Sequence, residues 1–218
     1  MRPYDLICFD VDGTLVVHDE EKIVWEILNR RFRGDDAVDR TRFLDYSQGR
    51  IRYAEWVALD VGDWLRAGAT REQILAAMDG LRLIEGTHET LAELKRRGYK
   101  LAIISGTLDI VLDRLLPEHP FDDVYLNRLQ FDEGGRLTGC EATPYDVEGK
   151  ARALREIAER EHIPLARCAF VGDSFNDVAV AREAGFAVAL NPKCEELVAE
   201  ADVVVRGADL RLLLPYFP

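Results

Sequence analysis

An apolar run that ends in two carboxylates is the feature that most constrains the fold of this chain. Leu6 to Phe9 are all apolar, and Asp10, Asp12 and Gly13 come within four positions of them. Such a run is typical of a buried strand, and open α/β sheets bind their ligands at the carboxyl ends of strands. We therefore expect Asp10 at a strand end and Asp12 beside it. A simple Asp-Gly turn after a strand is the alternative.

Two carboxylates at one strand end favour phosphate chemistry. One carboxylate can attack phosphorus or hold a hard cation such as Mg²⁺ through oxygen, and the other can move the proton of the leaving group. The rest of the chain has to decide between this chemistry and a turn.

Further strand candidates predict a parallel α/β sheet. They lie at 4–9, 101–104, 168–171, 186–190 and 203–205, and segments of helical periodicity separate most of them. Residues 17–83 contain no convincing strand but carry amphipathic runs at 23–32, 53–65 and 71–78, which predicts a helical insertion. A glycine turn within 126–137 predicts an antiparallel hairpin at the edge of the sheet.

Composition excludes several partner classes. The 218 residues carry a formal net charge of −12, which disfavours nucleic acid and anionic membranes as partners. The four cysteines form no Cys-x-x-Cys pair, so we expect reduced, structural thiols. No segment approaches eighteen apolar residues and no leader sequence is evident, so a cytoplasmic protein is expected.

Two more strand ends and one helix start carry candidate functional groups. Ser105 and Gly106 follow the run 101–104, Asp173 and Asp177 follow 168–171, and Lys150 begins a helix predicted over 149–161. Taken singly, Ser105 is explained as a helix N-cap, Asp173 and Asp177 as the start of an N-capped helix, and Lys150 as an exposed lysine. Together they place acids or a hydroxyl at three strand ends, which favours a phosphate site.

These segments resemble a known family. Asp10-x-Asp12-Gly13-Thr14, Ser105, Lys150 and Gly172-Asp173-x-x-Asn176-Asp177 are similar to the four ordered motifs of the haloacid dehalogenase superfamily of phosphatases. Within it the chain looks most like the phosphoserine phosphatases, because Asn127-Arg128-Leu129 and Leu137-Thr138-Gly139 are also similar. A helical cap between the first two motifs fits the same family.

The resemblance implies a role for each matching residue. Asp10 is implied to attack phosphorus and form an aspartyl-phosphate, while Asp12 protonates the leaving alcohol and then activates water. Ser105 and Lys150 are implied to hold the transferring phosphoryl group, with help from the backbone of Gly106.

A magnesium site is implied by the same motifs. The Asp10 and Asp173 carboxylates and the Asp12 backbone carbonyl are expected to hold Mg²⁺, with Asp177 and Asn176 organising its surroundings. Phosphoryl transfer depends on in-line positioning and charge neutralisation, and Mg²⁺ with Lys150 would supply the positive charge.

The cap is where the resemblance becomes weaker. Asp19 or Glu20 is expected to bind a substrate ammonium group. The register anchored on residues 49–53 puts Ala58 where an arginine for a substrate carboxylate is expected, which makes phosphoserine a doubtful substrate. The expected cap contains three tryptophans, Trp25, Trp56 and Trp64. We expect them to pack within the cap, and an apolar lid over the substrate is the alternative.

The sequence thus predicts a Rossmann-like parallel core over residues 1–16 and 84–218, with a helical cap over 17–83 hinged near Val16 and Gly86. The predicted activity is Mg²⁺-dependent phosphomonoester hydrolysis of a small phosphorylated metabolite. A phosphomutase that uses the same aspartyl-phosphate, and a non-catalytic protein that binds a phosphorylated metabolite, are the alternatives.

Overall fold

A computed structural model of the protein describes residues 2–34, 37–147 and 149–218. The strands are β1 (Leu6–Phe9), β2 (Val16–His18), β3 (Leu81–Leu83), β4 (Lys100–Leu108), β5 (Asp123–Phe131), β6 (Leu137–Glu141), β7 (Cys168–Gly172), β8 (Phe186–Leu190) and β9 (Val203–Val205). The α-helices are α1 (Val24–Phe32), α2 (Ala37–Ser47), α3 (Tyr53–Arg66), α4 (Arg71–Ala77), α5 (Thr87–Arg96), α6 (Asp109–Leu115), α7 (Gly149–Arg160), α8 (Val178–Glu183) and α9 (Glu195–Glu200). Short 3₁₀ segments are η1 (Leu165–Arg167), η2 (Phe175–Asp177) and η3 (Leu210–Tyr216).

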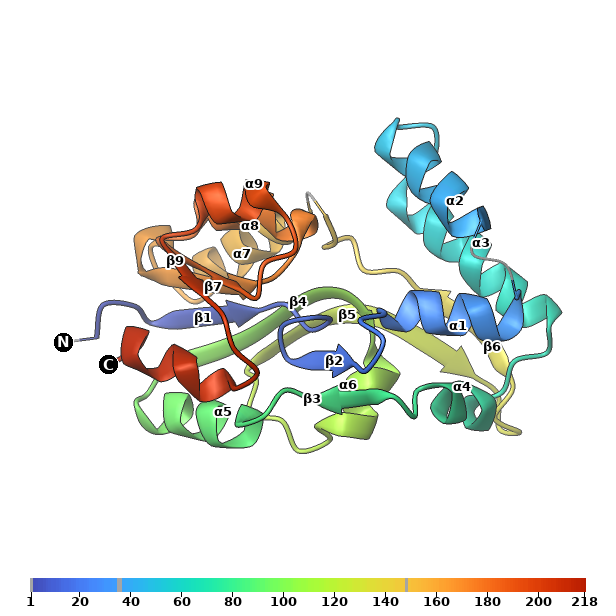
Figure 1. Ribbon diagram of the computed structural model, residues 1–218, viewed down its shortest axis with the longest axis horizontal. Helices are drawn as coiled ribbons and strands as arrows, with labels where there is room; N and C mark the ends of the chain where they lie inside the picture. Colours follow the sequence, from blue (N-terminus) through green and yellow to red (C-terminus); the bar gives the residue numbers. More distant parts are fainter. Residues whose placement is uncertain (1, 35–36, 148) are drawn as a thin grey trace.

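Seven of the described strands form one sheet in the order β6-β5-β4-β1-β7-β8-β9 (Figure 1). Every neighbouring pair is parallel except β5 with β6, which form the predicted antiparallel hairpin at the edge. The predicted α/β class with a mostly parallel sheet is therefore confirmed.

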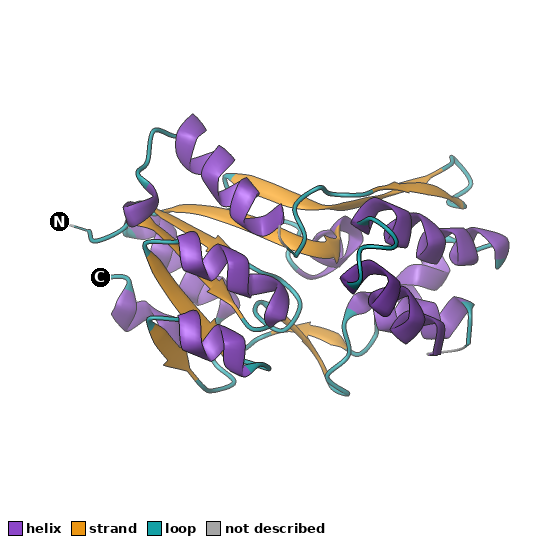
Figure 2. Ribbon diagram, turned by 90° about the horizontal axis from the view of Figure 1, so that it is seen from above, coloured by secondary structure: helices purple, strands orange, loops and turns teal. Residues whose placement is uncertain are grey.

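Helices cover both faces of this sheet, because its central strand is apolar on both sides. Ile7 and Phe9 belong to one buried cluster, and Leu6 and Cys8 belong to another. Helices α7 and α8 pack on the second cluster, while α5, α6 and η3 cover the first, so that the sheet lies between two layers (Figure 2). A strand buried on both faces reads as a continuous apolar run, which is how the sequence signals it.

The register of the three central strands brings their carboxyl ends together. Phe9 of β1 is level with Ile103 of β4 and with Val171 of β7. The residues that follow these positions therefore emerge at one edge of the sheet, between the core and the cap.

The cap differs from the prediction in two ways. Val16–His18 and Leu81–Leu83 pair as a two-stranded antiparallel ribbon at its base, although no strand was expected within 17–83. Each strand has three residues, which is too short for an alternating pattern to be recognised, and their pairing joins distant segments. The cap also contains α2, which the periodicity did not indicate because none of its described residues is buried.

The remaining cap helices pack around a buried tryptophan. Trp64 of α3 is fully buried, and its Nε1 donates a hydrogen bond to Asn29 Oδ1 on α1 at 2.8 Å. The Trp25 ring lies 5.2 Å from the Trp64 ring. Trp64 therefore packs within the cap, as expected.

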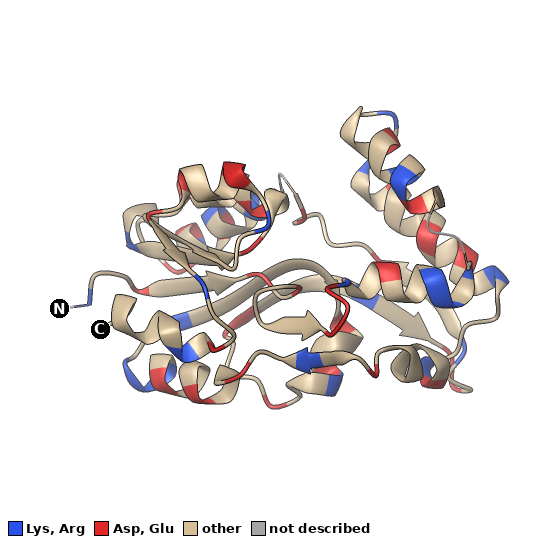
Figure 3. Ribbon diagram, in the orientation of Figure 1, with Lys and Arg blue, Asp and Glu red and all other residues tan. Residues whose placement is uncertain are grey.

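Helix α2 is attached by charge rather than by apolar burial. Arg42 of α2 and Arg33 at the end of α1 both pair with Asp60 and Asp63 of α3. The side chain of Asp60 is only 3% exposed, so this network is screened far less than a surface ion pair. Both signs of charge run along α2 and α3 in Figure 3.

The core also supports the cap through the β5–β6 hairpin. Leu137 N donates to Ala69 O at 3.0 Å, and Arg71 N donates to Gly135 O at 2.8 Å, which ties the turn between α3 and α4 to the hairpin. Within the described ranges, no helix has both the length and the apolar character needed to cross a membrane.

Replacing Trp64 by Phe should lower the free energy of unfolding by about 1–3 kcal/mol, because it leaves Asn29 Oδ1 buried without its donor and removes core volume. Urea denaturation measures this change. Leu59→Ala, on the exposed side of the same helix, is the control and should change the free energy by less than about 0.5 kcal/mol. Equal effects for both variants would contradict the packing described.

Candidate active site

Asp10 and Asp12 meet Asp173 at the edge of the sheet. Asp10 N donates to Val171 O at 2.9 Å, which extends the β1–β7 pairing by one step. Gly13 then turns the chain with φ +86°, and a Cβ at this position would lie 2.0 Å from Asp173 Oδ2. Only glycine accommodates this turn, so the Asp-Gly pair does more than end a strand.

Lys150 is the buried cation of the site. Its side chain is fully buried in the first turn of α7, with Nζ 2.8 Å from Asp10 Oδ1 and 2.7 Å from Asp177 Oδ1. Burial lowers the pKa of Lys150, but the negative charges of Asp10 and Asp177 outweigh burial and raise it above its usual value. The ammonium group is therefore charged, and the alternative of an exposed lysine is wrong.

Asp177 and Asp173 have different surroundings. Both oxygens of Asp177 are engaged, because Oδ1 pairs with Lys150 and Oδ2 accepts hydrogen bonds from Asp173 N at 2.8 Å and Ser174 N at 3.1 Å. Asp173 Oδ2 pairs with Lys193 Nζ at 2.8 Å, whereas its Oδ1 is buried with no hydrogen-bond partner among the described residues. Asp173 thus keeps one oxygen available for a ligand.

These carboxylates also fit a divalent cation. Asp10, Asp173 and Asp177 each offer an oxygen within 4.8 Å of the others, and all three are buried. When all of them are ionised, these three carboxylates and Asp12 carry four negative charges, against the two positive charges of Lys150 and Lys193. A hard divalent cation with a preference for oxygen ligands would balance the remaining two charges.

The crowding of acids raises their pKa values. Burial, and next the negative charge of Asp10, raise the pKa of Asp12 to about 7. Burial and Asp10 likewise raise the pKa of Asp173. Burial raises the pKa of Asp177 against the opposing charge of Lys150. Asp12 is therefore a carboxyl group that can carry a proton near neutral pH, as a general acid must.

Ser105 and Gly106 form the third side of the site. Ser105 Oγ accepts a hydrogen bond from Thr107 N at 3.2 Å. Gly106 O accepts hydrogen bonds from Trp25 Nε1 at 2.8 Å and from Asn127 Nδ2 at 2.6 Å. A Cβ on Gly106 would lie 2.2 Å from Asp146 Oδ2, so any larger residue here would displace the Asp146 side chain.

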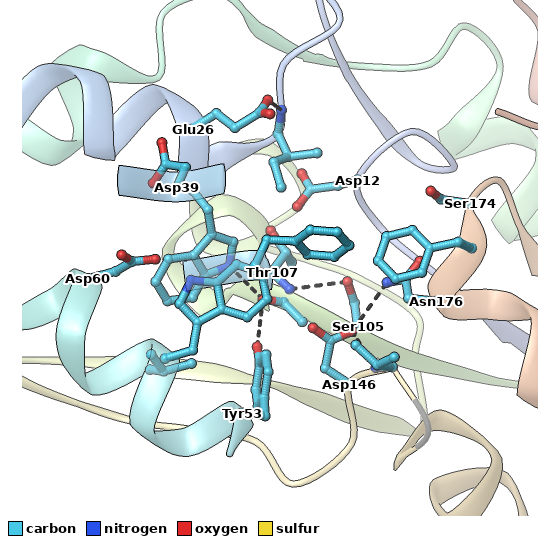
Figure 4. A pocket seen from close by; sticks show the side chains of 18 of the residues that line it. Asp12, Glu26, Asp39, Tyr53, Asp60, Ser105, Thr107, Asp146, Ser174 and Asn176 are labelled. Carbon is cyan, nitrogen blue, oxygen red and sulfur yellow. Dashed lines mark hydrogen bonds between the residues drawn. The ribbon is translucent and has the colours of Figure 1, made fainter. Parts of the chain in front are cut away.

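These groups line one pocket of about 360 Å³ between the core and the cap. Its floor holds Asp10, Asp12, Ser105, Gly106, Asp173, Asn176 and Lys193. The apolar part of its opposite wall, here called the roof, consists of Trp25, Phe43, Tyr53, Trp56 and Val57 of the cap with Phe175 of η2, and the cap side also carries Glu26, Asn29, Asp39, Arg40 and Asp60. Figure 4 shows Asp39 and Asp60 on the cap helices, across the pocket from Ser174 and Asn176.

Three cap residues do not lie where the sequence placed them. Asp19, expected to bind an ammonium group, has a side chain 70% exposed and pairs with Arg82 on the surface. Glu20, its alternative, is 68% exposed and pairs with Lys22. Ala58 is exposed and does not line the pocket, because α3 presents Tyr53, Trp56, Val57 and Asp60 to it at helical spacing.

Several lining residues were missed by the sequence analysis. Lys193 pairs with Asp173 from the loop after β8, and Asp146 accepts a hydrogen bond from Asn176 Nδ2 at 3.2 Å. Tyr53 receives a hydrogen bond from Asn127 Nδ2 at 2.8 Å. Lys193 follows the predicted strand 186–190 by three positions, a signal that the sequence analysis did not use, whereas Asp146 and Tyr53 follow no predicted strand end. Trp25 and Trp56 also line the pocket, as the apolar-lid alternative anticipated.

Without metal, the protein should lose stability as the pH rises from about 5 to 7. The raised pKa values of Asp12, Asp173 and Asp177 mean that the folded state binds more protons than the unfolded chain in this window, so the free energy of unfolding falls with rising pH. Urea denaturation with EDTA measures the trend. Mg²⁺ should remove it, because a cation replaces the bound protons. A metal-free protein that gains stability over this range would contradict the charge balance described.

Comparisons with known proteins agree with this geometry. The sequence pattern of the haloacid dehalogenase-like hydrolases matches residues 4–185. A phosphoserine phosphatase of Archaeoglobus fulgidus is 34% identical over 201 residues, which cover 88% of this chain and 56% of that protein. A phosphoserine phosphatase of Methanocaldococcus jannaschii is 31% identical over 218 residues, which cover 97% of this chain and 96% of that protein. The chain thus spans about half of the first relative and nearly all of the second.

Solved structures show the same fold over the full chain. A substrate-bound phosphoserine phosphatase superposes with a TM-score of 0.78 at 28% identity, covering 99% of both chains. A phospho-aspartyl intermediate analogue of phosphoserine phosphatase superposes with a TM-score of 0.75, again at 28% identity and 99% coverage of both chains.

Proposed function

This chain belongs to the haloacid dehalogenase-like hydrolases, and from that premise we propose that it is a Mg²⁺-dependent phosphomonoesterase that forms an aspartyl-phosphate on Asp10. The observation that carries the proposal is the buried ion-pair chain of Asp10, Lys150 and Asp177 at the ends of β1 and β7. Phosphatase activity also agrees with the similarity of this chain to phosphoserine phosphatases.

In the first half-reaction, a carboxylate oxygen of Asp10 attacks phosphorus as the bond from phosphorus to the ester oxygen breaks. Asp12 gives its proton to the departing alkoxide, and the pKa near 7 makes the protonated form available. The products are an alcohol and phospho-Asp10. Lys150 keeps Asp10 oriented through the 2.8 Å contact with its Oδ1.

In the second half-reaction, water attacks the phosphorus of phospho-Asp10. Asp12, now a carboxylate, takes the proton of that water, and the bond from phosphorus to the Asp10 oxygen breaks. Inorganic phosphate leaves and Asp10 is restored. One residue serves as acid and then as base because its pKa lies near neutrality.

The phosphoryl group is held by the groups around the pocket floor. Ser105 Oγ, the backbone N–H of Gly106 and the amide of Asn176 line the position that it would occupy. Lys150 Nζ lies behind them, 2.8 Å from Asp10 Oδ1, and supplies positive charge from beneath the pocket floor. Donors fixed in place before the reaction stabilise the charge on the non-bridging oxygens.

For Mg²⁺, the proposed ligands are the Asp10 carboxylate, the spare Oδ1 of Asp173 and the Asp12 backbone carbonyl. Asp177 orients the Asp173 loop, because its own oxygens are already engaged. When bound, Mg²⁺ neutralises the charge that would otherwise repel a phosphate from Asp10.

Residues 17–83 are proposed to act as a cap on a core made of 1–16 and 84–218. The β2–β3 ribbon joins the two connections between these parts, close to the predicted hinges at Val16 and Gly86. Closure of the cap would exclude bulk water while the ester is cleaved. A small phosphorylated metabolite is the proposed substrate, and a cytoplasmic location stays a prediction.

Neither alternative function has a specific observation in its favour. A phosphomutase would need to bind a second phosphate, and the roof, as far as its residues are described, is aromatic and aliphatic. A non-catalytic binding protein does not require a nucleophile and an acid beside one another.

Replacing Asp10 by Asn should lower kcat for phosphate release by roughly 10⁴-fold or more, because the nucleophile is lost. The assay is Mg²⁺-dependent phosphate release from 4-nitrophenyl phosphate. Asp79→Asn is the matched control, since that side chain is 81% exposed and lies outside the pocket. Substantial turnover by the Asp10 variant would rule out the aspartyl-phosphate.

Replacing Asp12 by Asn should separate the two half-reactions. With 4-nitrophenyl phosphate, whose leaving group needs little protonation, the variant should release about one equivalent of nitrophenol and then stall, because no base activates water. With an alkyl phosphate, the first step itself should slow by about 10²–10⁴-fold. Rapid-quench measurements of the nitrophenol released per mole of enzyme give the size of the burst. Continued wild-type turnover of both esters would refute the role of Asp12.

A further inference from the structure

The roof of the pocket differs chemically from its floor, and this difference bears on which phosphate ester the protein accepts. Aromatic and aliphatic side chains form the roof, and the leaving group of an ester held on the floor faces them. Phe43 and Phe175 keep 37% and 48% of their surface exposed although they line this pocket. Exposed apolar surface gathered in one concave place is typical of a binding site.

The rings of the roof support one another. The Trp56 ring lies 5.5 Å from Tyr46, 6.1 Å from Phe43 and 6.5 Å from Tyr53, and the Phe43 ring lies 5.7 Å from Phe175. Hydrogen bonds from Trp25 Nε1 to Gly106 O and from Asn127 Nδ2 to Tyr53 Oη tie two rings to the core. A wall already ordered in this way loses little side-chain entropy when a ligand packs on it.

The acidic residues on the cap side of the pocket already have partners. Asp60 pairs with Arg33 and Arg42, and Asp39 pairs with Arg33 and accepts a hydrogen bond from Asn29 Nδ2 at 2.8 Å. Glu26 Oε2 accepts a hydrogen bond from Ile23 N. The partners of these three acids thus belong to the cap itself.

A substrate carboxylate would find little to bind. Among the described lining residues, the cations are Lys193, which pairs with Asp173 on the floor, and Arg40, which is exposed on α2. An ion pair between a substrate carboxylate and the exposed Arg40 would be screened by water and salt, so it would contribute less than a buried pair. The face of α3 that lines the pocket carries Asp60 and no cation.

We propose that the preferred substrate is a phosphate monoester whose leaving alcohol carries an aromatic or similarly flat apolar group and no carboxylate. The inference rests on the proposed phosphatase function. It concerns the roof of the pocket, whereas the proposed chemistry on phosphorus belongs to the floor.

Four esters of primary alcohols test the proposal: ethyl phosphate, 2-phenylethyl phosphate, phosphoethanolamine and L-phosphoserine. Relative to ethyl phosphate, the others add a phenyl ring, an ammonium group, or an ammonium group with a carboxylate. The kcat/KM for 2-phenylethyl phosphate should exceed that for ethyl phosphate by about 100-fold, because the ring is removed from water against the roof. It should exceed that for L-phosphoserine by at least as much.

Variants of the roof connect this preference to its cause. Trp56→Ala should reduce the ratio of kcat/KM between 2-phenylethyl and ethyl phosphate by about tenfold. Phe43→Ala, at a partly exposed position that tolerates truncation, should reduce the same ratio. Leu59→Ala, on α3 but outside the pocket, is the control and should keep it. Thermal melting verifies that each variant is folded.

The outcomes are distinct. A kcat/KM for L-phosphoserine or phosphoethanolamine above that for 2-phenylethyl phosphate would overturn the proposal, as would four values within threefold of one another. An unchanged ratio in both roof variants would overturn it as well. If no ester releases phosphate, 4-nitrophenyl phosphate included, the phosphatase function itself fails.

Discussion

The buried ammonium group of Lys150 is the interaction on which the site depends. It lies between Asp10 and Asp177, on the first turn of a helix, with no exposure to solvent. Removing either carboxylate partner would leave a buried charge less compensated, which is costly in a low-dielectric interior. The ion pairs therefore hold the ends of β1 and β7 at a fixed distance from α7, and with them the proposed nucleophile and the Asp173 loop.

The same charge balance links stability to chemistry. Four carboxylates face two lysines, so the metal-free site retains excess negative charge and the pKa of Asp12 rises to about 7. This is unfavourable for folding at neutral pH, but it gives Asp12 a proton to donate. Strain of this kind is expected where a site is arranged for a reaction rather than for stability.

Core and cap divide the work between charge and shape. The core supplies carboxylates, a hydroxyl and lysines around the phosphate position, whereas the cap supplies rings that are fixed by contacts within the cap and by Asn127 and Gly106 of the core. Under the proposed function, substitutions in the cap would change which alcohol is accepted without moving the groups proposed to act on phosphorus. This separation explains how one scaffold can serve several substrates.

The sequence by itself determined the parallel sheet and the acids after β1 and β7, because apolar runs buried on both faces are local signals and parallel strands direct their carboxyl ends to one edge. Ser105 lies within β4, which continues to Leu108 through a register irregularity instead of ending at Ile104. Only the tertiary structure decided the rest. The β2–β3 ribbon joins distant three-residue segments, Lys193 reaches Asp173 from a loop, and the face that α3 turns to the pocket depends on how the cap packs. Asp19 and Ala58 were misplaced for that reason: position along the chain does not say which side of a helix or turn meets the substrate.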